Sequence, residues 1–145
     1  MKITNKNIDA GNAFDWGRTS KDYAKYRDIY PSVFYEKIAE RGLCVANQRV
    51  LDLGTGTGVL PRNMYTYGAN WTGTDISQQQ IEEAKALARQ MNQNISYFCV
   101  SAEDISFTSH TFDVITACQC FWYFDDERLL PKRLQYLKPE GRLLF

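Results

Sequence analysis

The stretch Val-Leu-Asp-Leu-Gly-Thr-Gly-Thr-Gly, residues 50–58, decides the fold class of this chain. A short apolar run contains an acidic residue and leads into a turn with glycine at every second position. The segment from Val59 onward is compatible with a helix. Glycine lacks a Cβ atom, so the chain can adopt strained conformations and lie directly against a ligand. The stretch therefore predicts a strand, a tight loop and a helix, which form a nucleotide-type binding loop at the carboxyl end of a parallel strand.

The spacing of the glycines narrows the type of ligand. A dinucleotide fingerprint would place its third glycine at Val59, and a P-loop would need Gly-Lys-Ser/Thr, which is missing here. The remaining pattern, acidic-x-Gly-x-Gly-x-Gly, resembles motif I of the class I S-adenosylmethionine-dependent methyltransferases. The resemblance implies that Gly54, Gly56 and Gly58 let the backbone approach the methionine part of the cofactor. It also implies that Asp52 helps to hold the cofactor's amino group.

Helical and strand-like segments alternate along the rest of the chain. Residues 1–13 are expected to be a flexible N-terminus, and residues 14–145 to be one S-adenosylmethionine-binding domain. The resemblance implies an α/β, Rossmann-like, doubly wound and mostly parallel sheet with strand order 3-2-1-4-5. Because the chain stops in an apolar strand after a Lys-Pro-x-Gly turn at residues 138–141, we expect the domain to lack the family's last two strands. The sequence predicts strands at 48–53, 69–75, 94–100 and 112–118, and helices at 31–43, 59–67, 77–91 and 125–137.

Asp75 ends the second predicted strand, about twenty residues after the glycine loop. A carboxylate at this place accepts hydrogen bonds from both ribose hydroxyls of a bound nucleoside. The alternative is a helix N-cap, because Ser77 and a helix follow directly. Ribose binding would not separate S-adenosylmethionine from NAD, since both carry an adenosine ribose. Ile76 is expected to pack on the adenine face.

Residues 101–107 follow the third predicted strand and resemble the family segment that holds adenine, commonly Asp-Ala-x-x-Leu-Pro-Phe. Ala102 matches this pattern, whereas Ser101 replaces the usual acid. The resemblance implies that the Ala102 backbone N–H contacts adenine and that Ser101 or Glu103 accepts from its exocyclic amine. For Glu103, an ordinary polar loop remains the alternative.

Residues 14–31 are unusually aromatic and resemble the N-terminal segment of many small-molecule methyltransferases, with the pattern Tyr-x-x-Tyr-Arg-x-x-Tyr-Pro. In such proteins the tyrosine and the arginine often reach the carboxylate end of the cofactor, and a guanidinium can bind a carboxylate in bidentate fashion. Tyr23 and Arg27 are therefore candidates for a lid over the cofactor. The alternative is an aromatic arm packed over the sheet edge.

The segment 118–124 follows the fourth predicted strand at the ligand edge of the sheet and is rich in aromatic residues. It predicts a wall near the reactive methyl group, where aromatic faces could stabilise the sulfonium cation. Cys118 is the expected cofactor contact, and Gln119 and Trp122 are expected on the substrate side. The alternative is that some of these rings belong to the core.

Composition limits the partners. The chain has 17 Lys and Arg against 17 Asp and Glu, so nothing favours nucleic acid as a partner. No apolar run is long enough to span a membrane, and the first residues lack a signal peptide's apolar core. The four cysteines form no paired metal spacing, which favours reduced thiols in a cytoplasmic protein with no metal site. His110 is expected at the surface, and Asp113 is expected to have a structural role.

The sequence thus predicts S-adenosylmethionine-dependent methyl transfer to an unidentified small-molecule acceptor. No residue stands out as a catalytic base. Two alternatives remain, namely an NAD-binding oxidoreductase domain and a cofactor-binding module without turnover. An edge strand left open at the end of the chain could also pair with a second copy.

Overall fold

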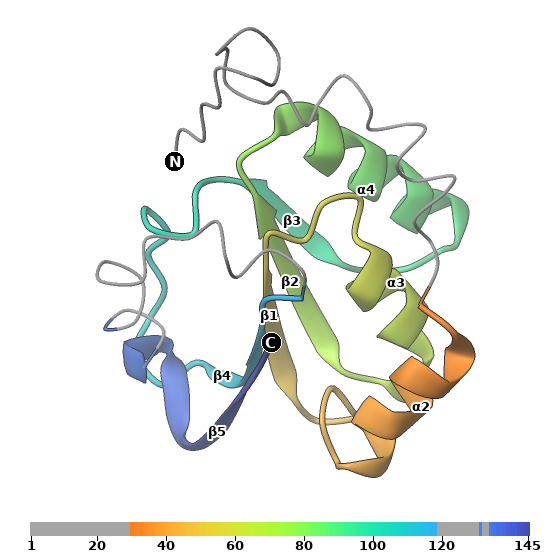
Figure 1. Ribbon diagram of the computed structural model, residues 1–145. Coiled ribbons are helices and arrows are strands. Elements are labelled where there is room, and N and C mark those ends of the chain that lie inside the picture. The colour runs from red at the N-terminus through yellow and green to blue at the C-terminus, as the bar shows by residue number, and fades with distance from the viewer. Residues whose placement is uncertain (1–29, 119–130, 132–133) are drawn as a thin grey trace, which may run out of the picture.

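Five parallel strands form one sheet in the computed structural model, which describes residues 30–118, 131 and 134–145 (Figure 1). The strand order is β3-β2-β1-β4-β5, and each neighbouring pair is parallel, so the predicted Rossmann-like order is confirmed. The strands are β1 (Arg49–Leu53), β2 (Asn70–Asp75), β3 (Ser96–Cys99), β4 (Phe112–Thr116) and β5 (Leu137–Leu144).

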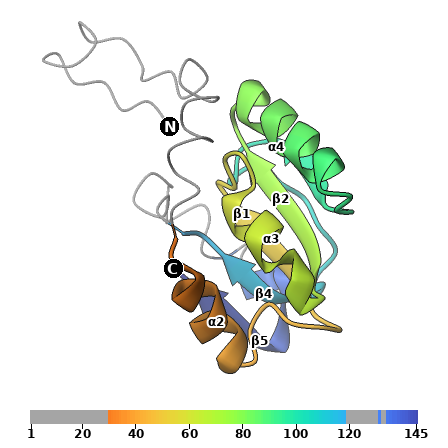
Figure 2. The same cartoon turned by 90° about the vertical axis from the view of Figure 1, so that its right-hand side faces the viewer.

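Three helices cover one face of the sheet, as Figures 1 and 2 show. They are α2 (Ser32–Glu40), α3 (Val59–Met64), which continues into the 3-10 turn η2 (Tyr65–Tyr67), and α4 (Gln78–Gln90). Helix α2 ends three residues earlier than the sequence predicts. Its C-cap is Arg41, and Gly42 then takes a left-handed φ of 69°. Ser77 caps α4, because its side chain accepts a hydrogen bond from the Gln80 backbone N–H.

Side chains alternate between the two faces of the sheet along each strand, and both faces are covered by other parts of the chain. On the helix face, Val50 and Val114 are buried together with Trp71 against α2 and α3. On the opposite face, Leu51 and Leu53 pack under the connection between β3 and β4. This packing fixes the carboxyl ends of β1, β2 and β4 beside one another. The buried residues that cover the two faces are Tyr35, Ile38, Leu60 and Met64 on the helix face, and Ala102, Ile105 and Tyr136 on the other.

The end of the chain differs from the prediction. Leu137 was expected to end a helix, but it begins β5 and pairs with Phe112. The next pair joins Val114 to Arg142, so several residues of β5 lie opposite one residue of β4. The Lys-Pro-x-Gly segment is therefore an irregularity inside the strand, and not a turn that precedes it. Most of the predicted helix at 125–137 lies outside the described residues.

The amino-terminal edge of the sheet is held by Asp113. Its carboxylate accepts the Arg49 backbone N–H at 2.8 Å and the Lys138 ammonium at 2.8 Å. Burial raises the pKa of Asp113, but these hydrogen bonds and the nearby positive charges outweigh that effect and hold the pKa below its ordinary value. The predicted structural role of Asp113, remote from the ligand edge, is confirmed. His110 is exposed, as predicted.

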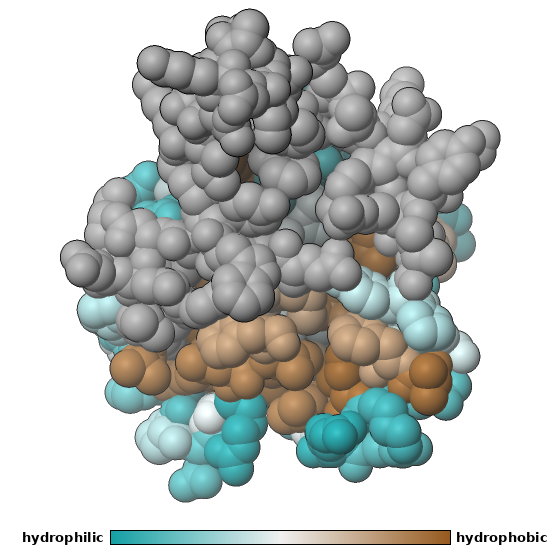
Figure 3. All heavy atoms as spheres, in the orientation of Figure 1, coloured by the Kyte–Doolittle hydropathy of each residue, from teal (hydrophilic) through white to brown (hydrophobic). Residues whose placement is uncertain are grey.

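Strand β5 forms one edge of the described sheet. In Figure 3, hydrophobic residues gather in a band that runs from the β5 side of the molecule towards α2. Val33, Leu134 and Phe145 are among the exposed large hydrophobic residues. Pairing of β5 with another chain remains a prediction. No helix in the described part of the chain is long and apolar enough to cross a membrane.

Candidate cofactor site

The glycine loop joins β1 to α3 at the carboxyl edge of the sheet. Gly54, Gly56 and Gly58 have φ values of 63°, 57° and 75°, all in the left-handed region that residues with a side chain rarely adopt. The loop is tied to β2, because the Thr55 N–H donates to the Thr74 carbonyl oxygen at 2.9 Å. The alternating glycines are thus required by the path of the backbone itself.

Asp75 connects this loop to the start of α4. Its carboxylate accepts the Gly56 N–H at 2.9 Å and the Ser77 N–H at 2.9 Å. The helix cap is Ser77, so the alternative interpretation of Asp75 as the N-cap of α4 is wrong. Burial raises the pKa of Asp75, and the backbone N–H groups of Ser77, Gly56 and Ile76 offset part of that effect. An ionised carboxylate has about four acceptor sites, so it can still accept hydroxyl groups from a ligand.

Asp52 lies on β1 next to the loop and is only 3% exposed. The Thr116 hydroxyl on β4 donates to its Oδ1 atom at 2.6 Å. Burial raises the pKa of Asp52 to about 6, although the hydrogen bond from Thr116 and the nearby Thr55 hydroxyl act in the opposite direction. The negative charge of Asp75 raises it further. A buried carboxylate of this kind favours a cationic partner.

The segment after β3 is held by its own polar contacts. The Ser101 hydroxyl donates to the Asp104 carboxylate at 2.7 Å and accepts the Asp104 N–H at 3.2 Å, so Ser101 stabilises a turn. Ala102 and Glu103 are buried within that turn. Ile76 follows Asp75 with 57% of its surface exposed, and its packing on an adenine face stays a prediction. Sequence reasoning missed Asp104, the residue that restrains the Ser101 side chain.

Tyr97 on β3 lies directly beneath the glycine loop, which the sequence did not predict. A Cβ atom on Gly58 would meet the Tyr97 hydroxyl oxygen, and a Cβ atom on Gly73 would lie 2.8 Å from the Tyr97 ring. The ring is 4% exposed and fills the space that these two glycines leave. Gly58 therefore also makes room for a side chain of the protein itself. The only sequence signal for this contact was a large aromatic residue at the second position of β3.

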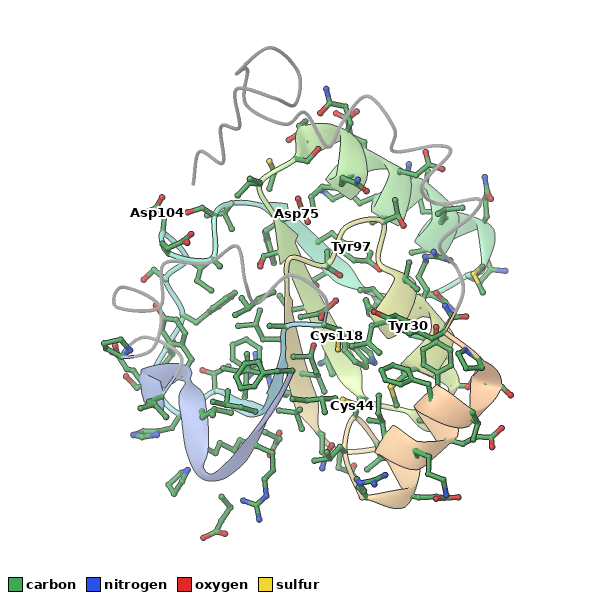
Figure 4. The ribbon with its side chains drawn as sticks, in the orientation of Figure 1. Tyr30, Cys44, Asp75, Tyr97, Asp104 and Cys118 are labelled. Carbon is green, nitrogen blue, oxygen red and sulfur yellow. The ribbon has the colours of Figure 1, made fainter. Side chains whose placement is uncertain are left out.

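The strand ends bring some of the predicted residues together and leave others untested. Figure 4 shows Asp75 and Tyr97 on the neighbouring strands β2 and β3, and Cys118 after β4, on the other side of β1. Cys118 is half-buried two residues after the end of β4, and burial together with the charge of Asp52 raises the pKa of its thiol. In the described part of the chain, no group of three His, Cys, Asp or Glu residues is placed to hold a metal ion. The predicted contacts Tyr23, Arg27, Gln119 and Trp122 lie outside the described residues.

Comparison with known proteins identifies the family. Residues 50–141, more than half of the chain, match the family model described as a methyltransferase domain. The chain belongs to this family. The match begins in β1 and continues into β5, so it contains the glycine loop, Asp75 and the segment after β3.

Three relatives show how far the likeness extends. A ubiquinone biosynthesis O-methyltransferase of Coxiella burnetii is 33% identical over 153 residues, with 100% of this chain and 64% of that protein covered. A putative S-adenosyl-L-methionine-dependent methyltransferase of Methanococcus maripaludis has the same fold, with a TM-score of 0.76, 20% identity, and 88% and 61% of the two chains covered. The cyclase SpnF has a TM-score of 0.71 and 28% identity, with 78% and 44% covered. The chain thus spans less than two thirds of the length of the curated relatives it matches first.

Proposed function

We propose that this chain binds S-adenosylmethionine and serves the transfer of its methyl group to a small-molecule acceptor. The observation that carries the proposal is the pair of acids on neighbouring strands, Asp52 and Asp75, on either side of the glycine loop. Asp75 accepts the Gly56 N–H at 2.9 Å, so the loop and this acid form one unit. The cofactor presents an ammonium group at one end and a ribose diol in the middle, which match the two acids in chemistry.

The described residues fit this cofactor. Burial and the negative charge of Asp75 both raise the pKa of Asp52. An incoming ammonium group would therefore compensate an unfavourable buried negative charge. Asp75 keeps acceptor capacity for the ribose hydroxyls beyond its two N–H donors. Ile76 is exposed where an adenine ring would follow the ribose. In this assignment Asp52 holds the ammonium end of the ligand, Asp75 holds the ribose in the middle, and Ile76 packs on the adenine end.

The chemistry asks little of the protein beyond alignment. The positively charged sulfur of the cofactor activates its methyl group for in-line displacement by a nucleophilic acceptor atom. Transfer would leave the sulfur as a thioether, and the acceptor would lose its proton to water or a base. The contribution of this chain is to fix the ligand's ends, so that the methyl group points to the acceptor. No described residue is assigned as the base.

The acceptor is proposed as a small molecule with a nucleophilic oxygen. The neutral charge balance of the chain does not favour a nucleic acid. The similarity to proteins named as O-methyltransferases supports a hydroxyl group as the acceptor. The likeness to a cyclase means that turnover has to be measured separately from binding.

Calorimetric titration of this chain with S-adenosylmethionine, S-adenosylhomocysteine and NAD tests the proposal. We expect both adenosyl compounds to bind and NAD not to bind. Binding of NAD alone would overturn the methyltransferase assignment in favour of an oxidoreductase domain. If a chain shown to be folded by circular dichroism bound none of the three, the assigned site would be wrong for this chain.

Asp75→Asn should weaken S-adenosylhomocysteine binding by roughly 1–3 kcal/mol, because an amide presents one acceptor oxygen to the ribose in place of two. The same change removes one acceptor from the Gly56 and Ser77 N–H groups, so the loop is also affected. Comparing adenosine with 2′,3′-dideoxyadenosine separates the two effects. The substitution should matter for adenosine and have little effect on the analogue without the diol. An equal loss for both would assign Asp75 to loop structure alone.

A further inference from the structure

A short hydrogen bond at the ligand edge joins the side chains of two buried residues, Thr116 and Asp52. Thr116 is fully buried on β4, and its hydroxyl lies 2.6 Å from Asp52 Oδ1. Asp52 and Thr116 are register partners of the parallel β1–β4 pair, so the backbone fixes their separation. The other acceptor near this hydroxyl, the Leu51 carbonyl oxygen, is 3.5 Å away. The hydroxyl proton therefore points to the carboxylate, which favours the ionised form of Asp52.

The hydrogen bond from Thr116 matters because the titratable groups around Asp52 do not stabilise its negative charge. Four titratable groups interact electrostatically with Asp52, namely Asp75 on β2, Tyr97 on β3, Cys44 after α2 and Cys118 after β4. Asp75 carries negative charge, and burial keeps the two thiols and the phenol neutral. None of these four groups supplies positive charge. The hydroxyl groups of Thr116 and Thr55 are the groups that oppose the effect of burial on Asp52.

We propose that Thr116 is a positioning residue for the ammonium group of the cofactor, because it holds the Asp52 carboxylate in the orientation and charge state that receive this group. The inference rests on the proposed function. It adds a residue on β4 to a site whose acids come from β1 and β2. Thr116 does not contact the ligand itself and acts through Asp52.

The test is the pH dependence of ligand affinity in Thr116→Val, which keeps the size of the side chain and removes the hydroxyl. S-adenosylhomocysteine is the probe, since its amino group stays protonated in the range used. Without the hydrogen bond, Asp52 should titrate at higher pH. Affinity should fall about tenfold near pH 6 and recover to within about twofold of the original chain near pH 8.5. Thr116→Ser should restore the original profile.

Two controls separate this role from a purely structural one. 5′-Methylthioadenosine lacks the amino acid part of the cofactor, so its affinity should not change in Thr116→Val at any pH. Thr74→Val makes the same change on the neighbouring strand, at a buried hydroxyl without a hydrogen-bond partner in the described part of the chain. It should leave the pH profile unchanged.

Two outcomes would overturn the role of Thr116 while leaving the proposed function intact. One is an unshifted pH profile in Thr116→Val, and the other is an equal loss of both ligands at every pH. If Thr116→Val does not fold, Thr116→Ser and Thr116→Ala give the same comparison, and only the alanine variant should show the shift. Failure of the original chain to bind either ligand would instead reject the proposed function, and this inference with it.

Discussion

Asp52→Asn should lower the affinity for S-adenosylhomocysteine by roughly 10- to 100-fold at neutral pH, because the ammonium group loses a charge-assisted hydrogen bond inside the protein. The asparagine side chain has nearly the same shape as aspartate. Its oxygen can still accept from the Thr116 hydroxyl, which lies 2.6 Å from Asp52 Oδ1 in the original chain. Isothermal titration with S-adenosylhomocysteine measures the loss. 5′-Methylthioadenosine is the control ligand, and its affinity should change little.

The same substitution should stabilise the unliganded protein. Burial raises the pKa of Asp52 from 3.8 to about 6, so the folded state holds a proton in a range where the unfolded state has released it. Stability associated with this group is therefore fully present below 3.8 and is lost as the pH rises through about 6. Above that value the buried charge costs up to about 3 kcal/mol. Asp52→Asn removes this cost.

Urea unfolding at several pH values measures that gain. The variant should be more stable than the original chain at neutral pH, and the difference should shrink as the pH falls from 6 towards 4. Weaker binding together with higher stability is expected when a residue serves ligand binding at the expense of fold stability. A variant that is less stable at neutral pH would contradict the view that the buried charge of Asp52 destabilises the unliganded fold.

The strands and the loop were predictable because their signals are local. A short apolar run followed by glycine at every second position identified β1 and its turn, and Asp75 marked the end of β2. The order 3-2-1-4-5 came from the family resemblance, and the observed pairing confirms it. The boundaries of elements were off by one to several residues. The error at Leu137 has a structural reason, because the strand irregularity between Phe112 and Val114 lets β5 begin before the Lys-Pro-x-Gly segment.

The contacts between elements were not predictable from the sequence. The partnership of Asp52 with Thr116 depends on the register of β1 against β4, which no spacing along the chain reveals. The two N–H donors to Asp75 depend on the loop folding back over β2. Tyr97 was not singled out, although its ring fills the space beneath Gly58 and Gly73. Long-range packing thus decides what supports the loop, whereas the residues that form it are visible in the sequence.

Gly58→Ala should destabilise the fold by about 3 kcal/mol or more, since two separate costs act at this position. The backbone φ is 75°, where any side chain is strained. The new Cβ atom would also meet the Tyr97 hydroxyl oxygen and lie 2.8 Å from its Cζ atom. Tyr97 has little freedom to move, because its ring also lies against Gly73 on β2. The midpoint of urea unfolding measures the total cost.

Gly42→Ala separates the two costs, because Gly42 has nearly the same φ, 69°, but nothing within 4 Å of an added Cβ atom. Backbone strain alone should make this variant about 1 kcal/mol less stable. The excess in Gly58→Ala then measures the collision with Tyr97. Adding Tyr97→Leu to Gly58→Ala should recover part of that excess, so that the two changes together cost less than their sum. Equal losses for Gly42→Ala and Gly58→Ala would mean that Tyr97 yields easily. In that case the glycine at position 58 would be required by the path of the backbone, and the ring beneath it would be free to adapt.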